Sequence, residues 1–190
     1  GKLLNYSISA GVSDYTTKVT RYNNPSKLLS KYYVGQTLGE LWGFSVGGFF
    51  VSDEEAANYP VDQSYLNQQI ITSVGERGLR AGDVKYLDLD GDNEISIGSN
   101  TVDNPGDQRI IGNTLPRYAY NFKLGASWNG VDFSAFFQGI GHQDWYPAGN
   151  AISFWGPYSR PYCSFIPTQF MDEVWTETHT GAYFPRARGY

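Results

Sequence analysis

Three aspartates stand at alternate positions in the segment "DLDGDNEIS", which runs from Asp88 to Ser96. The carboxylates of Asp88, Asp90 and Asp92 repel one another when they converge without a counter-ion. Gly91 lets the chain curl, so that these alternate side chains can point toward one centre. A hard cation such as Ca²⁺ takes roughly six to eight oxygen ligands and favours carboxylates. We therefore expect Asp88, Asp90 and Asp92 to be ligands of a structural calcium ion.

The remaining ligands of this calcium site are less well specified by the sequence. Glu94 stands at the seventh loop position, where a calcium hand supplies a backbone carbonyl, and Ser96 at the ninth, where a water bridges. The twelfth position is Ser99 instead of the usual carboxylate. A closing ligand must come from further along, and the candidates are Asp107 and Asp103. The alternative is an Asp/Gly-rich turn whose charges are only solvated.

A strand pair with clear periodicity follows this loop. Residues 118–128 alternate apolar and polar or small side chains, with aromatic or aliphatic residues at every even position. Asn129 and Gly130 then favour a type I′ turn, and the alternation resumes from Val131 to Gln138. This pattern predicts a β-hairpin.

The start of the chain has the same strand periodicity, since Leu4, Tyr6, Ile8, Ala10 and Val12 alternate with polar or small residues. The alternation begins almost at residue 1, so we expect the chain to be part of a longer protein. Residues 14–36 are polar and mixed, which indicates a loop or a strand pair. Residues 41–51 predict a strand that Gly47 and Gly48 interrupt with a bulge or a close backbone approach. Ser52 and Glu55 have capping-box spacing, which predicts a short helix continuing intermittently through residue 73.

The composition supports an all-β fold and excludes some functions. Of 190 residues, 41% are hydrophobic and 16% aromatic, and 22 are Gly, a mixture that favours strands and tight turns. The net charge of −5 and the absence of a Lys/Arg run argue against a nucleic-acid partner. Cys163 is the single cysteine, which excludes an intrachain disulfide.

No apolar run approaches the roughly 20 residues of a membrane-spanning helix, but a β-strand can cross a membrane with far fewer residues. Residues 118–128 are long enough to cross a bilayer when tilted, and their apolar face has aromatic residues near both ends. The two-residue Asn129–Gly130 connection contrasts with the long polar and aromatic segments 52–115 and 141–190. Outer-membrane barrels combine short turns on one side with long loops on the other. Periodicity alone favours a strand of a water-exposed sandwich, and the contrast in connection length is what favours a barrel.

The residues just described also carry a family resemblance. The runs "GDVKYLDLDGDNEIS" and "GDQRIIGNTLPRYAYNFKLGASWNGVDFSAFFQGIG" closely resemble the late-barrel region of the SusC/RagA family of TonB-dependent outer-membrane transporters. Further similar segments are "GQTLGELWGFSVGGFFVSDEEA", "FWGPYSRPY" and "AYFPRARGY", in the family's order and over nearly the whole chain. The resemblance implies that residues 1–190 are antiparallel strands from the C-terminal part of a transmembrane β-barrel, with long extracellular loops and minor helical turns. Residues 81–115 would form an extracellular calcium-binding loop.

The resemblance also implies a function. Family members import nutrients such as oligosaccharides or oligopeptides across the outer membrane of Gram-negative cells. A SusD-like surface lipoprotein caps the barrel, and the TonB complex drives transport through an N-terminal part that would lie outside this sequence. One departure from the family pattern is "IGSNTVDNPG", which separates Ser96 from Asp107 and puts Asp107 as closing ligand in doubt.

A function of another class is a secreted, calcium-stabilised carbohydrate-binding module or glycan-active enzyme domain. Catalysis would need two carboxylates about 5 to 9 Å apart, which Asp172, Glu173 and Glu177 could supply. No recognisable catalytic motif surrounds His142 or His179, so we do not expect an enzyme. Several aromatic residues could stack on sugar rings or be buried: Trp42, Trp145, Trp155, Tyr158 and Tyr162.

Overall fold

The computed structural model describes residues 3–66, 78–147, 151–159 and 168–187. The chain divides into two compact units. The first unit comprises Gly1–Pro25, Tyr32–Leu41 and Gly112–Tyr146, and the second comprises Ser26–Lys31, Trp42–Ile111 and Pro147–Tyr190. The described strands are β1 (Asn5–Ser13), β2 (Glu40–Phe44), β3 (Val46–Phe49), β4 (Val84–Tyr86), β5 (Gln108–Asn113), β6 (Arg117–Trp128) and β7 (Val131–His142). The described helices are α1 (Asp53–Ala57), α3 (Ile152–Ser159) and α4 (Thr168–Asp172).

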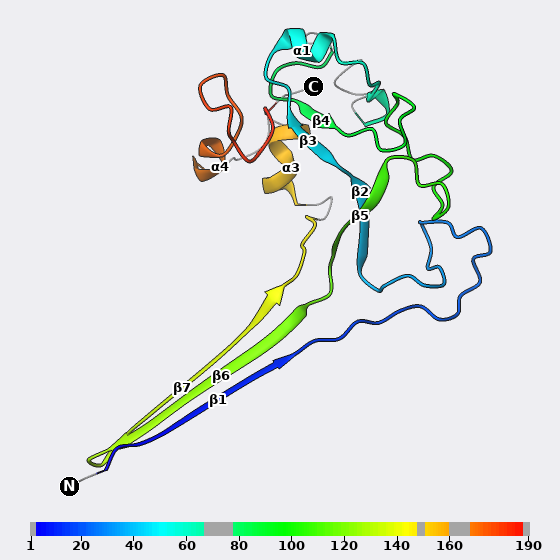
Figure 1. Ribbon diagram of the computed structural model, residues 1–190. Helices are drawn as coiled ribbons and strands as arrows, with labels where there is room; N and C mark the ends of the chain where they lie inside the picture. Colours follow the sequence, from blue (N-terminus) through cyan, green and yellow to red (C-terminus); the bar gives the residue numbers. More distant parts are fainter. Residues whose placement is uncertain (1–2, 67–77, 148–150, 160–167, 188–190) are drawn as a thin grey trace. The chain divides into compact units, whose positions relative to one another are not determined.

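The first unit is built on an antiparallel sheet in the order β1-β6-β7 (Figure 1). Asn129 and Gly130 join β6 to β7, with φ angles of 53° and 84°, as a type I′ turn requires. The predicted hairpin is therefore confirmed. The predicted N-terminal strand pairs with β6, from Asn5 opposite Ser127 to Ser13 opposite Ala119. The end of β1, the start of β6 and the end of β7 consequently lie at one end of the sheet, and the two-residue turn lies at the other.

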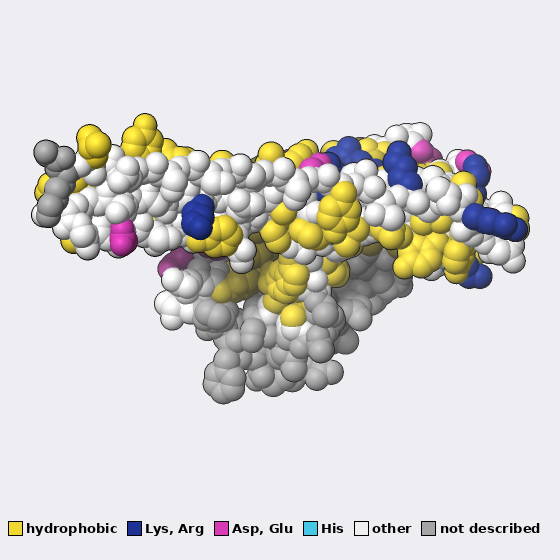
Figure 2. Space-filling model, turned by 90° about the horizontal axis from the view of Figure 1, so that it is seen from below, with side chains coloured by type: hydrophobic (Ala, Val, Ile, Leu, Met, Phe, Trp, Pro, Cys, Tyr) yellow, Lys and Arg dark blue, Asp and Glu magenta, His cyan; other side chains and the backbone are white. Residues whose placement is uncertain are grey.

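Register places most of the apolar side chains of the three strands on one face of this sheet, because directly paired residues point to the same side. Phe136 and Ile140 of β7 lie on the other face, opposite Lys123 and Ala119. Val12, Ala10, Ile8 and Tyr6 lie opposite Tyr120, Phe122, Leu124 and Ala126, and the last three of these lie opposite Phe137, Ala135 and Phe133. We call this set the apolar face. Most of its large side chains are exposed, including Ile8 at 65% and Phe133 at 59%. Figure 2 shows groups of hydrophobic side chains at the molecular surface.

The second unit has a small core of its own. Phe50 and Ile95 are fully buried, and Val174 and Trp175 nearly so. Strands β3 and β4 pair antiparallel, with a register shift between Val46 and Gly48. The predicted bulge is thus confirmed, but the single strand predicted over 41–51 is interrupted at Ser45, which separates β2 from β3. Strand β2 pairs with β5.

Helix α1 begins as the capping spacing predicts. The hydroxyl of Ser52 accepts a hydrogen bond from the backbone amide of Glu55 at 3.1 Å. The carboxylate of Glu55 accepts from the amide of Val51 at 2.7 Å, one residue earlier than a reciprocal capping box would place it. The helix ends at Ala57, helical residues resume at 64–66, and the rest of the predicted continuation, 67–73, lies outside the described residues.

The fold is mostly antiparallel β-sheet with a few short helices, in agreement with the predicted all-β class. None of the described sheets closes on itself. Residues 14–36 contain two isolated bridge partners, Lys18 opposite Thr37 and Leu28 opposite Thr101, so the predicted loop or strand pair is mainly loop. No helix among the residues that the structure describes is long and apolar enough to cross a membrane.

Candidate metal centre

Three of the predicted ligands converge in the second unit. Asp88, Asp90 and Asp107 each offer a carboxylate oxygen, and these three oxygens lie within 4.8 Å of one another. Asp88 and Asp90 follow β4, whereas Asp107 directly precedes β5. We call these residues the acidic triad. The Asp/Gly loop and the closing carboxylate therefore meet, as the calcium prediction requires.

Short local hydrogen bonds fix the curl of the loop around Asp88. Its two carboxylate oxygens accept from the backbone amides of Gly91 at 2.6 Å and Asn93 at 2.9 Å. Gly91 and Asn93 have φ angles of 82° and 65°, in the left-handed region that Gly and Asn tolerate best. The glycine expected to curl the chain thus lies within a turn that folds around Asp88.

Asp107 is the anchor of the triad because it is fully buried. Its carboxylate accepts from the backbone amide of Leu89 at 2.7 Å and from that of Ser96 at 2.8 Å. These amides flank the Asp90–Ile95 segment on both sides. A single buried carboxylate thereby holds the two ends of the loop, while Asp88 and Asp90 extend toward it.

The segment "IGSNTVDNPG" does not carry Asp107 away, because it folds into a closed loop. The carbonyl of Ser96 accepts from the amide of Asp107 at 3.0 Å, so the chain leaves and returns at the same point. Gly98 and Gly106 make this closure possible, since a Cβ on Gly106 would lie 2.5 Å from the amide nitrogen of Gly98. The sequence put Asp107 in doubt because a long segment separates it from Ser96. The closed loop brings Asp107 back beside Ser96 despite that length.

The other candidate ligands lie differently. The carboxylate of Asp92 accepts from the amide of Glu94 at 2.8 Å, and neither residue belongs to the acidic triad. Asp103 forms an ion pair with Lys27 at 3.0 Å, with 72% of its side chain exposed. Ser99 accepts from the side-chain amide of Asn104 at 3.1 Å. Of the two closing candidates, the structure brings Asp107 and not Asp103 to the triad.

The electrostatics of the triad favour a positive counter-ion. Loss of surrounding water raises the pKa of the Asp90 carboxyl above its usual range. Repulsion from Asp92, Asp107 and Asp88 raises the same pKa further. Three carboxylates offer hard oxygen ligands of the kind that Ca²⁺ takes. The acidic triad is therefore a candidate cation site.

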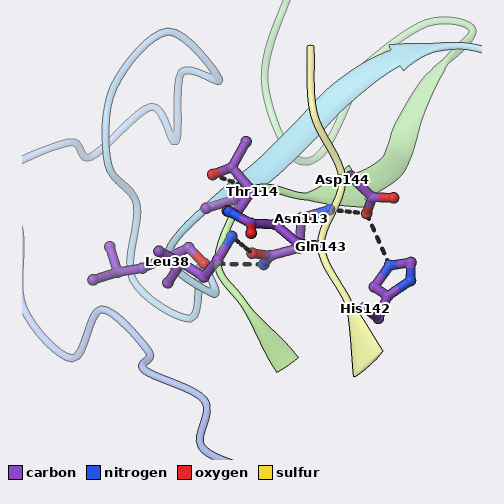
Figure 3. Close-up of polar contacts among 8 residues, drawn as sticks. Leu38, Asn113, Thr114, His142, Gln143 and Asp144 are labelled. Carbon is purple, nitrogen blue, oxygen red and sulfur yellow. Dashed lines mark hydrogen bonds and ion pairs between the residues drawn. The ribbon is translucent and has the colours of Figure 1, made fainter. Parts of the chain in front are cut away.

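A second polar cluster, in the first unit, was not predicted. The side-chain amide of Asn113 donates to the carbonyl of Leu38 at 2.9 Å (Figure 3). Its backbone amide donates to the carboxylate of Asp144 at 2.6 Å, and Nε2 of His142 lies 3.1 Å from the same oxygen. Gln143 donates to the carbonyl of Thr114 at 2.9 Å. We call this the Asn113 network.

The Asn113 network connects segments far apart in sequence at the end of the sheet opposite the Asn129–Gly130 turn. The hydrogen bond from Asn113, followed by the contact with His142, lowers the pKa of Asp144. No periodicity or motif marks these residues, because their partners lie about 30 and 75 residues away. His142 thus has an acidic partner that the sequence did not reveal.

Some of the aromatic residues considered for sugar stacking pack against other rings, and others are exposed. Phe154 packs edge-on against Trp155 at 4.8 Å between ring centroids, and Tyr158 against Phe170 at 6.2 Å. Burial raises the pKa of the Tyr158 hydroxyl to about 12. Trp145 is 75% exposed, and Tyr162 lies outside the described residues.

No protein-family model and no curated protein matches this sequence. The function must therefore be argued from the residues and their geometry.

Proposed function

We propose that this chain is part of a TonB-dependent outer-membrane transporter of the SusC/RagA kind, which imports nutrients such as oligosaccharides or oligopeptides. One observation carries the proposal: a long antiparallel sheet whose apolar face is exposed, with a two-residue turn at one end and the long connections at the other. A water-exposed sandwich needs a second layer over such a face. A barrel wall instead presents it to lipid.

The lengths of the strands support the proposal. Strands β6 and β7 each have 12 residues, more than the roughly 9 to 11 that a tilted membrane strand needs. Tyr120 and Phe133 stand near opposite ends of the apolar face, with the Phe122–Phe137 and Leu124–Ala135 pairs between them. Aromatic residues near both ends of the lipid-facing side are a feature of barrel walls. The free edges of β1 and β7 are where further barrel strands would pair.

In this proposal the acidic triad is a structural calcium site in an extracellular loop. Calcium bound by Asp88, Asp90 and Asp107 would fix the loop between β4 and β5, and carbonyl or water oxygens would complete its shell. The loop would form part of a wall that faces cargo or a SusD-like lipoprotein. The TonB complex would act through a part of the transporter outside this sequence.

A charge on the apolar face tests the membrane assignment. Leu124→Arg in the complete transporter should impair barrel assembly, because an arginine near the bilayer midplane costs about 2 to 4 kcal/mol. Asn121→Arg is the matched control, since Asn121 lies on the opposite face of the same strand, paired with Gly11 and Gln138. Assembly is measured by heat-modifiable mobility on gels after refolding into detergent.

Two results would contradict the proposal. Equal assembly of the Leu124→Arg and Asn121→Arg proteins would show that the apolar face does not meet lipid. A monomeric, folded chain in water without detergent, able to bind glycans alone, would favour the secreted calcium-stabilised carbohydrate-binding module instead.

A further inference from the structure

Positive charge is concentrated in one segment of the chain. Residues 15–39 contain Lys18, Arg21, Lys27 and Lys31 and no Asp or Glu. The chain as a whole has 14 Lys and Arg against 19 Asp and Glu, so the remainder has 10 against 19. A segment with a charge of +4 in a protein with a net charge of −5 is a local exception. Such an asymmetry attracts an anionic partner.

The structure shows which of these cationic side chains could bind an anionic partner. Lys27 forms an ion pair with Asp103 in the second unit. Lys18 and Arg21, in the first unit, are exposed, and neither has a carboxylate partner in the part of the chain that the structure describes. Hydrogen bonds between backbone groups hold the base of this segment, with the amide of Val19 donating to Gln36 and that of Leu38 donating to Thr17, both at 2.8 Å. The backbone at Lys18 is thus fixed while its side chain is free.

Exposed tyrosines accompany Lys18 and Arg21. Tyr15 is 64% exposed and directly follows Asp14 at the end of β1. Tyr22 and Tyr32 pack edge to face with centroids 5.5 Å apart, yet about half of each side chain is exposed. Tyrosine and cationic side chains together suit the headgroup layer of a membrane, where the ring meets apolar groups and the cation meets phosphate.

We infer that Lys18 and Arg21 bind the phosphate groups of anionic lipid headgroups. The inference rests on the proposed function, because it places the end of β1 at the membrane surface. Val12, the last member of the apolar face on β1, is followed within nine residues by Tyr15, Lys18 and Arg21. That order gives lipid-facing, interfacial and phosphate-facing side chains along one continuous stretch. A lipid headgroup, more than a free polyanion, matches an anion site adjoining an apolar surface.

The test compares lipids that differ in net charge. The chain purified in an uncharged detergent is mixed with phosphatidylglycerol or phosphatidylcholine, and the retained lipid is counted by native mass spectrometry. Each cation near an anionic lipid surface contributes roughly fivefold in binding, so the double variant Lys18→Gln/Arg21→Gln should lose phosphatidylglycerol binding by about 25-fold at low salt. Phosphatidylcholine retention should stay unchanged. Lys27→Gln is the matched control, since Asp103 already neutralises Lys27.

The possible results separate this inference from the proposed function. Equal preference for phosphatidylglycerol in the wild-type chain and the double variant overturns the inference, as does an equal loss in Lys27→Gln. In both cases retained phosphatidylcholine leaves the membrane proposal intact. A chain that stays monodisperse without detergent and retains neither lipid overturns both. Displacement of phosphatidylglycerol by about 10 mM inorganic phosphate would assign the cations to a free anion and reject the lipid.

Discussion

Asp14 and Arg117 form an ion pair across 103 residues of sequence, with two hydrogen bonds of 2.5 Å between carboxylate and guanidinium. Asp14 directly follows β1, and Arg117 is the first residue of β6. The backbone amide of Tyr118 also donates to the same carboxylate at 3.3 Å. The pair therefore fixes the β1–β6 register at the end where the long connections leave the sheet.

We expect Asp14→Asn to loosen this end of the sheet without unfolding it. The bidentate pair is about one-third exposed on each side, so its loss should lower the melting temperature by only about 1 to 3 °C. Amide hydrogen exchange should accelerate at Ala119 and Ser13 but not beside the Asn129–Gly130 turn. Uniform acceleration along β6 would contradict a local role.

The same pair predicts a pH dependence. The bond from Arg117 lowers the pKa of Asp14 below its ordinary value of 3.8. A carboxyl with a lowered folded-state pKa contributes stability that is fully present above the ordinary pKa and is lost as the pH falls through the lowered one. The difference in melting temperature between wild type and Asp14→Asn should thus persist at pH 5 and disappear in strong acid.

Asp107 should matter for both folding and calcium affinity. Asp107→Asn turns one acceptor into a donor, which leaves the amide of Leu89 or Ser96 without a partner at a cost of about 1 to 3 kcal/mol. Calcium affinity, measured by isothermal titration, should fall by about tenfold or more because one ligand charge is lost. Asp103→Asn is the control, since Asp103 pairs with Lys27 outside the triad. Equal effects of the two substitutions would reject Asp107 as a ligand.

The raised pKa of Asp90 predicts opposite pH responses with and without calcium. In the metal-free chain, protonation relieves repulsion, so stability rises as the pH falls through the raised folded-state pKa and is lost as the pH rises. Calcium binding requires the charged carboxylates and therefore weakens over the same fall in pH. The gain in melting temperature on adding calcium should be largest near neutral pH and vanish in acid. A calcium effect that persisted unchanged in acid would exclude carboxylate ligands.

Gly106 should be intolerant of a side chain because of the closed loop between Ser96 and Asp107. An added Cβ would lie 2.5 Å from the carbonyl oxygen of Ser96, at a residue with a φ of 58°. We expect Gly106→Ala to open the loop and reduce calcium affinity. Gly35→Ala is the matched control, since Gly35 also has a positive φ, of 94°, but nothing lies within 4 Å of its added Cβ. A similar loss of affinity in both variants would point to backbone strain alone.

The parts of this protein that could be predicted from sequence are those set by local patterns. Alternation and the Asn-Gly pair predicted the β6–β7 hairpin, because a pleated strand and a type I′ turn each depend on neighbouring residues. Ser52 likewise predicted the start of α1. The split of the 41–51 strand at Ser45 was missed, because the two halves pair with different distant strands, β2 with β5 and β3 with β4.

The candidate site was only partly predictable for the same reason. The spacing of Asp88 and Asp90 marked a cation loop, and Asp107 was named as a closing ligand. That Asp107 and not Asp103 reaches the triad depends on the loop closure at Ser96, which no local pattern encodes. The Asn113 network had no signal at all, because Asn113, Leu38 and Asp144 become neighbours only after the strands have paired.

The Asn113 network also bears on how this protein can change over evolution. It binds the segments around Leu38, Asn113 and Asp144 to one another at the end of the sheet. Residues inserted or deleted beyond these anchors alter the loops while the strand register stays the same. The chain can therefore vary its loops while the sheet of β1, β6 and β7 keeps its register.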